Sequence, residues 1–264
     1  MEPNPARATA ATRPTETTAA PKTTAPTRRQ IVITIDGPAG AGKSVLSDRL
    51  ARHLGYLYYD TGALYRAVTW LALRDGVEPT DEATLAELAA TKPIDICPAT
   101  VADGRQYDVY ADGVDVTWAI RSPEVDARVS PVSAHPAVRA ALLPVQRAAA
   151  ARGGIVLAGR DAGTVVAPEA ELKVYLDCSF DVRAERRAQQ LADAGTPVDL
   201  ARVRTDLERR DGLDSSRAAA PLKPAPGAIV VNADKMTVDE EVEYLARLAR
   251  DREQACGRAS DPAN

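Results

Sequence analysis

Apolar residues form a repeating series of short runs along this chain, and the series predicts an α/β fold. Five mainly apolar runs of strand length occupy residues 31–35, 56–59, 155–158, 172–176 and 228–231. Such runs are typical of parallel strands that are buried on both faces. Between them, apolar residues recur at helical spacing, most clearly in residues 44–54, 63–74, 136–152 and 237–250. Strands that alternate with helices predict a parallel sheet with helices on both faces.

Two segments depart from this pattern. Residues 93–117 contain short alternating runs with Asp112-Gly113 as a hairpin signal, which predicts a small β insertion. Residues 181–194 and 198–210 predict two strongly charged helices joined by a short turn. A helical hairpin with so few apolar residues holds little core, so we expect this pair to move.

The first 29 residues consist mainly of Pro, Thr and Ala, with few large apolar side chains. Such a segment cannot bury enough apolar surface to offset the entropy that it would lose on ordering. We expect residues 1–29 to form a disordered arm that takes no part in the chemistry.

Composition and net charge indicate in which compartment the protein works and which partners it does not bind. The 264 residues are 45% hydrophobic and carry a net charge of −4, so neither a nucleic-acid nor a membrane partner is expected. Cys97, Cys178 and Cys256 are scattered and odd in number, which predicts reduced thiols. No apolar run approaches the length of a membrane span. We therefore expect a cytoplasmic protein.

The first apolar run leads directly into a glycine-rich turn, GPAGAGKS, at residues 37–44. This turn fits G-x-x-x-x-G-K-[ST] between a predicted strand and a predicted helix, which disfavours a chance match. The glycines let backbone N–H groups converge on phosphate oxygens at the start of the helix. Lys43 then offers a charge to the β- and γ-phosphates, and Ser44 a hydroxyl to Mg²⁺, which keeps most of its own waters. The turn predicts a site for a nucleoside triphosphate.

A phosphate loop alone does not separate kinases from switch GTPases and motor ATPases. The Asn-Lys-x-Asp motif that reads guanine is absent, and the remaining length holds no second triphosphate domain. Arginines instead follow the predicted strands, at Arg66 and Arg160, and occur along the charged hairpin. This arrangement favours a small kinase.

Four further segments carry a family resemblance when read with the phosphate loop. They are DTGALYR at 60–66, VSPVSAHPAVRAALLPVQR at 129–147, AGRDAGTVV at 158–166 and RRDGLDSSRAAAPL at 209–222. In this order, from about residue 31 to about residue 250, the chain resembles the bacterial cytidylate kinases, which phosphorylate CMP and dCMP. The β segment near residues 93–117 is similar to the enlarged monophosphate-binding insertion of these enzymes.

The resemblance implies an organisation and a reaction. It implies a kinase domain at 30–264, with a core at 30–79 and 134–264, an NMP-binding insertion at about 80–133 and a lid at about 181–217. It also implies transfer of the γ-phosphoryl group of ATP, with Mg²⁺, to CMP or dCMP. We expect the enzyme to be a monomer.

Transfer to a phosphate monoester needs no general base, because the acceptor is already an anion, so positioning and charge neutralisation supply the catalysis. The resemblance assigns catalysis to Lys43, Arg66, Arg160 and Arg217. It assigns ATP binding to Gly37, Pro38, Ala39, Gly40, Ala41, Gly42, Lys43, Ser44, Val45, Arg183 and Arg187. Arg186 lies on the same predicted helix, so which of its arginines contact ATP stays open. It assigns CMP binding to Thr61, Arg66, Ser130, Arg139, Arg160, Asp161, Arg210, Asp214 and Arg217.

Cytosine presents an amino donor where uracil presents an acceptor, so a site that prefers cytosine needs an acceptor beside a donor. By resemblance, Ser130 and Asp161 accept from the amino group and Arg139 donates to the ring. Asp214 and Arg210 would contact the sugar hydroxyls, and Arg217 would lie in the phosphate region.

Structural alternatives remain open for these residues. Arg66 and Arg160 could form salt bridges at element ends, Asp161 could merely anchor Arg160, and the pattern R-x-x-x-D-x-x-R could be a surface ion-pair ladder. Two other functions also remain: a kinase for another small acceptor such as dephospho-CoA or shikimate, and a nucleotide-binding regulator without turnover.

Overall fold

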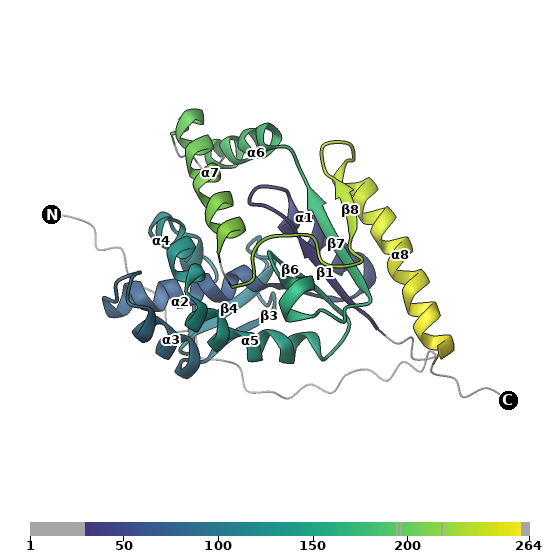
Figure 1. Cartoon of the computed structure of the whole chain (residues 1–264), viewed down its shortest axis with the longest axis horizontal. Helices are drawn as coiled ribbons and strands as arrows, with labels where there is room; N and C mark the ends of the chain where they lie inside the picture. Colours follow the sequence, from purple (N-terminus) through teal and green to yellow (C-terminus); the bar gives the residue numbers. More distant parts are fainter. Residues whose placement is uncertain (1–29, 194, 196, 218, 260–264) are drawn as a thin grey trace. The chain divides into compact units, whose positions relative to one another are not determined.

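The computed structural model describes residues 30–259 apart from residues 194, 196 and 218 (Figure 1). The predicted arm at residues 1–29 lies outside the described residues. The described chain falls into two compact units, Ala63–Leu142 as unit 1 and the remainder, before Ala63 and after Leu142, as unit 2. The boundaries of the kinase domain, the insertion and the lid stay predictions.

Unit 2 is built on a parallel five-stranded sheet in the order β2-β6-β1-β7-β8. Its strands are β1 (Val32–Asp36), β2 (Leu57–Asp60), β6 (Ile155–Gly159), β7 (Leu172–Asp177) and β8 (Ile229–Asn232). The five apolar runs thus become the five strands, and Ile33 and Ile35 of the central strand are fully buried. The predicted parallel α/β fold is confirmed.

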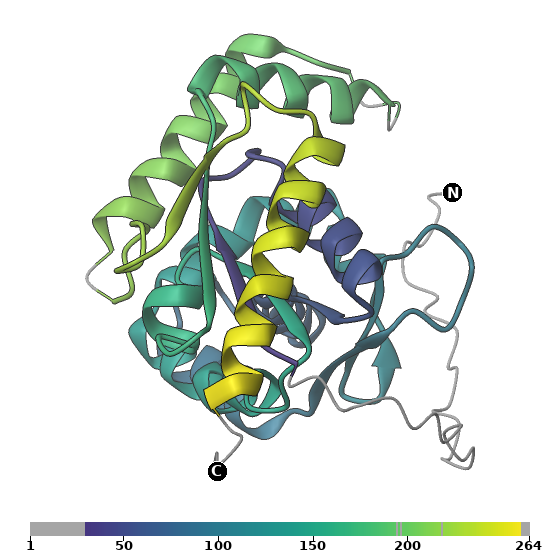
Figure 2. The same cartoon turned by 90° about the vertical axis from the view of Figure 1, so that its right-hand side faces the viewer.

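Helices and a short turn complete unit 2. The helix α1 (Lys43–Leu54) packs on β6 and β2, while α8 (Val238–Ala259) packs on α1 and β7. Figure 2 shows α8, in yellow, running along the sheet. A single π turn, η2 (Ala162–Val166), follows β6.

A charged helical pair, α6 (Phe180–Asp193) and α7 (Leu200–Ser216), follows β7. The buried members of its small apolar cluster are Ala184, Val203 and Leu207 together with Ala39 of the phosphate loop, and Phe180 and Leu191 pack against them. The helix α7 continues past residue 210, where the sequence predicted its end, although Gly212 disfavours a helix by about 1 kcal/mol. Tertiary ion pairs of Asp211 and Asp214, in the last turns, override that propensity.

Unit 1 combines helices with an antiparallel sheet in the order β3-β4-β5. Asp112 and Gly113 have φ angles of 54° and 79°, as the predicted two-residue hairpin turn requires. The remaining elements, some of them shared with unit 2 at their ends, are α2 (Thr61–Asp75), α3 (Glu82–Thr91), β3 (Ile94–Pro98), β4 (Tyr107–Ala111), β5 (Val114–Asp115), η1 (Ala119–Arg121), α4 (Pro123–Ala134) and α5 (Pro136–Ala150).

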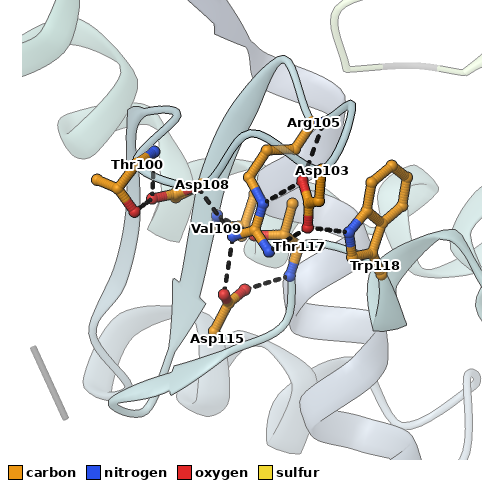
Figure 3. A network of polar contacts seen from close by, with 8 residues as sticks. All are labelled: Thr100, Asp103, Arg105, Asp108, Val109, Asp115, Thr117 and Trp118. Carbon is orange, nitrogen blue, oxygen red and sulfur yellow. Dashed lines mark hydrogen bonds and ion pairs between the residues drawn. The ribbon is translucent and has the colours of Figure 1, made fainter. Parts of the chain in front are cut away.

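A buried arginine pairs with three carboxylates in the antiparallel part of unit 1 (Figure 3). The guanidinium of Arg105 lies 2.8 Å from Asp103, 2.9 Å from Asp108 and 2.9 Å from Asp115, and its side chain is 7% exposed. Because these carboxylates come from a loop, from β4 and from β5, the arginine links three separate segments.

The same carboxylates hold neighbouring groups. Asp108 accepts hydrogen bonds from the backbone N–H and the hydroxyl of Thr100, at 3.1 and 2.6 Å. Asp103 accepts from the indole N–H of Trp118 at 2.9 Å, just before η1 (Figure 3). The network therefore fixes the loop after β3 and the chain that enters η1.

Removing the arginine should destabilise the protein strongly. We expect Arg105→Met to lower the free energy of unfolding by about 3 to 5 kcal/mol, because it leaves the fully buried carboxylate of Asp108 without its cation. The matched control is Arg204→Met, which breaks a pair with Asp181 whose side chains are 41% and 73% exposed. That variant should cost less than about 1 kcal/mol. Urea unfolding measures both, and equal losses would contradict the importance of the network.

Candidate functional site

The phosphate loop leaves β1 through positions that only glycine can occupy. A Cβ atom at Gly37 would lie 2.4 Å from the carbonyl oxygen of Leu176 on the neighbouring strand β7. Gly42 has a φ of 99° and forms the N-cap of α1. Backbone without side chains is therefore what lets the loop turn sharply at the end of the sheet and open the helix.

Lys43 lies buried within this loop. Its ammonium donates a hydrogen bond to the carbonyl oxygen of Pro38 at 2.7 Å. Burial and the nearby charge of Arg160 hold the pKa of Lys43 well below its usual value, against the opposing effect of Asp60 and Asp214. The ammonium thus lies inside the cradle that the loop forms, bound to a carbonyl oxygen that a phosphate oxygen can replace.

Ser44 is exposed on the first turn of α1, next to the loop. Among residues 30–259, as far as they are described, no group of three or more His, Cys, Asp or Glu could hold a metal ion. An exposed hydroxyl at a phosphate loop suits a cation such as Mg²⁺, which keeps water and phosphate oxygens as most of its ligands.

Arginines of α6 hold the backbone of the loop. Arg183 is buried and donates to the carbonyl of Ala39 at 3.0 Å, and it pairs with Asp211 of α7 at 2.7 Å. Arg186 donates to the carbonyls of Ala41 and Ala233 at 3.3 and 2.9 Å. The loop and the helical pair are therefore joined by polar contacts.

The arginines of α6 were only partly anticipated. The sequence selected Arg183 and Arg187, and the structure places Arg183 against the loop and Arg187 half-buried on the same helix. Arg186, which also holds the loop, was noted on the same helix but not selected. Three arginines within five positions of one helix cannot be ranked from sequence, because the register of the helix against the loop decides which of them reaches it.

A cluster of charges lies where β6 and α7 end. Asp214 accepts from Arg160 at 2.8 Å and pairs with Arg217 at 3.3 Å, and Arg217 also donates to the carbonyl of Ala220 at 2.7 Å. The side chains of Arg217 and Asp214 are 6% and 18% exposed, so this is not an exposed surface ladder. Burial alone would raise the pKa of Asp214, but the charges of Arg160, Arg217 and Arg210 lower it.

Three more polar side chains lie near the ends of β1, β2 and β6. Thr61 is buried and donates to the carbonyl of Ala158 at 2.9 Å, and Asp161 is buried at the start of η2. Asp36, which the sequence analysis did not select, is also buried. Burial raises its pKa to about 6, against two backbone hydrogen bonds that lower it. The sequence signal for Asp36 was its position, because it is an acidic residue directly after the apolar run 31–35.

Unit 1 carries its own group of predicted residues. Arg66 donates to the carbonyl of Ile120 at 3.0 Å and pairs with Asp126 at 2.6 Å. Asp126 was not predicted, since nothing local marks it.

Two of the residues predicted to recognise the base belong to unit 1: Ser130 lies on α4 and Arg139 lies on α5. Arg139 is buried, with its guanidinium 5.1 Å from the ring centre of Tyr65, and it donates to the carbonyl of Ser133 at 3.1 Å. Ser130 is half-buried on α4. Unit 1 thus contains Arg66, Ser130 and Arg139, while the remaining predicted site residues belong to unit 2.

The fold and the loop together define a class of protein. A parallel sheet whose central strand leads into a phosphate loop, followed by an arginine-rich helical pair, is the arrangement of the P-loop kinases. Within the described part of the chain, no helix combines the length and apolar character needed to cross a membrane.

Comparison with known proteins identifies the family. The family model described as cytidylate kinase matches residues 33–251, so the chain belongs to the cytidylate kinase family. A cytidylate kinase from Roseiflexus castenholzii is 46% identical over 220 residues, which cover 83% of this chain and 93% of the relative. One from Herpetosiphon aurantiacus is 45% identical over 216 residues, covering 82% of this chain and 93% of the relative.

Some relatives are longer. A bifunctional pantoate ligase/cytidylate kinase from Synechococcus elongatus is 48% identical over 225 residues, which are 85% of this chain and 43% of that protein. The chain therefore spans less than half the length of such bifunctional relatives.

The raised pKa of Asp36 predicts a pH-dependent stability. The pKa is about 6 in the fold against an ordinary value of 3.8, so the folded state binds this proton more tightly than the unfolded state. The contribution of Asp36 to the free energy of unfolding should rise as the pH falls from about 7.5 to about 5, by on the order of 1 kcal/mol. Urea unfolding of wild type and Asp36→Asn over this range measures it. A difference between the two proteins that does not change with pH would contradict the shift.

Proposed function

We propose that this protein transfers the γ-phosphoryl group of ATP to CMP or dCMP, forming ADP and CDP or dCDP. The observation that carries the proposal is membership of the cytidylate kinase family across residues 33–251, which includes a phosphate loop with its lysine buried in place. The proposed enzyme is a monomer of the cytoplasm, with a kinase domain at 30–264, an insertion at about 80–133 and a lid at about 181–217.

ATP would lie along the phosphate loop. Lys43 would exchange the carbonyl of Pro38 for oxygens of the β- and γ-phosphates, which is a small rearrangement because the ammonium already lies in the loop. Ser44 would hold Mg²⁺, which neutralises charge on these phosphates when it is bound. Further ATP contacts are proposed for the loop backbone from Gly37 to Val45 and for Arg183 and Arg187 of the lid.

Arginines would bind the acceptor phosphate. Arg66, Arg160 and Arg217 each carry several donors on a planar group, so each can keep its protein carboxylate or carbonyl and still donate to a phosphate. Their existing partners orient the guanidinium groups before the substrate arrives. The attacking oxygen belongs to a phosphate that is already an anion, so no base is needed, and placement of the two phosphates supplies the catalysis.

Hydrogen-bond acceptors, both neutral and ionised, would recognise the nucleoside. Asp161 and Ser130 would accept from the amino group of cytosine, and Arg139 would donate to its ring. Asp214, whose pKa is lowered by its arginine neighbours, stays ionised and can accept from a sugar hydroxyl, with Arg210 beside it. Thr61 would complete the CMP site near the end of β2.

Base preference tests the substrate. We expect the wild type to use CMP and dCMP well ahead of UMP and AMP, because a wrong base leaves polar groups unpaired at about 1 to 3 kcal/mol for each failed contact. Arg139→Ala should erode this preference. Arg66→Ala should instead reduce the use of every monophosphate and leave the order of bases unchanged, because phosphate contacts carry no base information.

The measurement is kcat/KM for CMP, dCMP, UMP and AMP in the three proteins. Equal use of CMP and AMP by the wild type would refute the proposed substrate and leave only a P-loop kinase of unknown acceptor.

The loop lysine can be tested against a closely matched lysine. We expect Lys43→Ala to reduce kcat at least about a hundredfold with the fold intact, because it removes a charge from the transferring phosphoryl group. Lys173 also donates to the carbonyl of a proline five residues earlier, Pro168, at 2.8 Å. Lys173→Ala should change kcat by less than about twofold. A coupled assay of ADP release measures both, and activity of Lys43→Ala within about tenfold of wild type would contradict the role of the loop.

A further inference from the structure

The end of β1 carries a buried carboxylate that the proposed reaction does not use. Asp36 is 2% exposed and directly precedes Gly37, the first residue of the phosphate loop. Its two oxygens accept one hydrogen bond each, from the backbone N–H of Ala162 and from that of Gly163, both at 2.8 Å. These donors lie 126 and 127 positions further along the chain.

Those two N–H groups open the π turn η2. The first N–H groups of any helical turn have no partner within the turn, so they need an acceptor from elsewhere. The carbonyl of Asp161 accepts from Val165 and Val166 at 2.9 and 3.3 Å, which places Asp161 at the head of the turn. Asp36 is therefore a cap supplied by the neighbouring strand, and it fixes the backbone immediately after Arg160 and Asp161.

The contact between β1 and η2 is closely packed. A Cβ atom at Gly163 would lie 2.7 Å from the hydroxyl of Thr34 and 3.3 Å from a carboxylate oxygen of Asp36. Residue 163 is thus a glycine because the turn approaches the strand too closely for a side chain. Strand pairing also places Asp36 opposite Gly159, the last residue of β6.

The chemistry of the contact requires a carboxylate. Two backbone donors face the two oxygens of Asp36, and an ionised carboxylate only accepts hydrogen bonds. An asparagine of the same shape would turn its NH₂ group toward one of the donors. That N–H group would be left buried and unpaired, so the turn would shift.

We propose that Asp36 is a positioning residue for the acceptor side of the site: it holds the segment of Arg160 and Asp161 at a fixed place relative to the start of the phosphate loop. This inference rests on the proposed function, in which those two residues bind CMP. A displacement of about 1 Å between reacting groups can cost a hundredfold in rate, so such a link between the donor loop and the acceptor segment has a direct kinetic effect.

The test compares two carboxylate-to-amide substitutions. Asp36→Asn, at the last residue of β1, removes the carboxylate that caps η2. Glu171→Gln is the matched control, because Glu171 accepts from the backbone N–H of Val32 at 2.9 Å, at the opposite end of the same strand. Gly163→Ala is a second test variant that pushes the turn away from Asp36 without changing any charge.

We expect Asp36→Asn and Gly163→Ala to lower kcat/KM for CMP by about tenfold to a hundredfold. For Gly163→Ala, which changes no charge, the affinity for the non-hydrolysable analogue with an imido bridge between the β- and γ-phosphates, measured by calorimetry, should stay within about twofold. Glu171→Gln should leave both quantities unchanged. Equal losses for CMP and for the analogue in Gly163→Ala, or unchanged use of CMP, would overturn the proposal.

Amide hydrogen exchange separates this inference from the proposed function. Residues 162–166 should exchange faster in Asp36→Asn than in the wild type and in Glu171→Gln, without any nucleotide present. Unchanged exchange in this turn would show that Asp36 does not hold it. A wild type that does not phosphorylate CMP would refute the proposed function, and the exchange result would still decide whether Asp36 fixes the turn.

Discussion

The burial of one ammonium group sets the conditions for the rest of the site. Lys43 lies inside the phosphate loop with a carbonyl oxygen as its hydrogen-bond partner, and its charge is unfavourable there without nearby anions. Asp60, Asp214 and Asp36 supply negative charge, while Arg160 adds positive charge. Lys43 is therefore one of several charged groups that influence one another near the carboxyl ends of the strands.

In the structure, two arginines of the proposed site already have partners. Arg160 pairs with Asp214, and in unit 1 Arg66 pairs with Asp126. Both arginine side chains are 23% exposed, so each pair is partly shielded from water and holds its guanidinium in place without any nucleotide. Because an arginine has five N–H donors, a phosphate can be bound without breaking every existing contact. The same pairs thus support the fold and, in the proposed function, orient the arginines for the acceptor phosphate.

The sequence predicted the parts of the fold that local patterns determine. Strands buried on both faces are mainly apolar, and the P-loop must contain glycine where Gly37 passes Leu176, so both were recognisable. The last turns of α7 were missed because Asp211 and Asp214 are held there by arginines of other elements. Asp36, Asp126 and Arg186 were not selected for a related reason. Their partners lie far away in the sequence, and even the position of Asp36 after an apolar strand does not show which groups it contacts.

The helical pair of unit 2 illustrates how contact type relates to movement. Its apolar cluster is small and includes only Ala39 from the phosphate loop, whereas its other links to the loop are hydrogen bonds from Arg183 and Arg186 to carbonyl oxygens. Hydrogen bonds of this kind can be exchanged for water or phosphate oxygens at little net cost, while a large apolar contact cannot be opened without exposing its surface. The network around Arg105 in unit 1 is the opposite case, because opening it would separate a buried cation from three carboxylates. The antiparallel part of unit 1 is therefore a fixed support for η1, whose Ile120 carbonyl accepts a hydrogen bond from Arg66. By the same criterion, we expect α6 and α7, the proposed lid, to be the elements that change position when nucleotide binds.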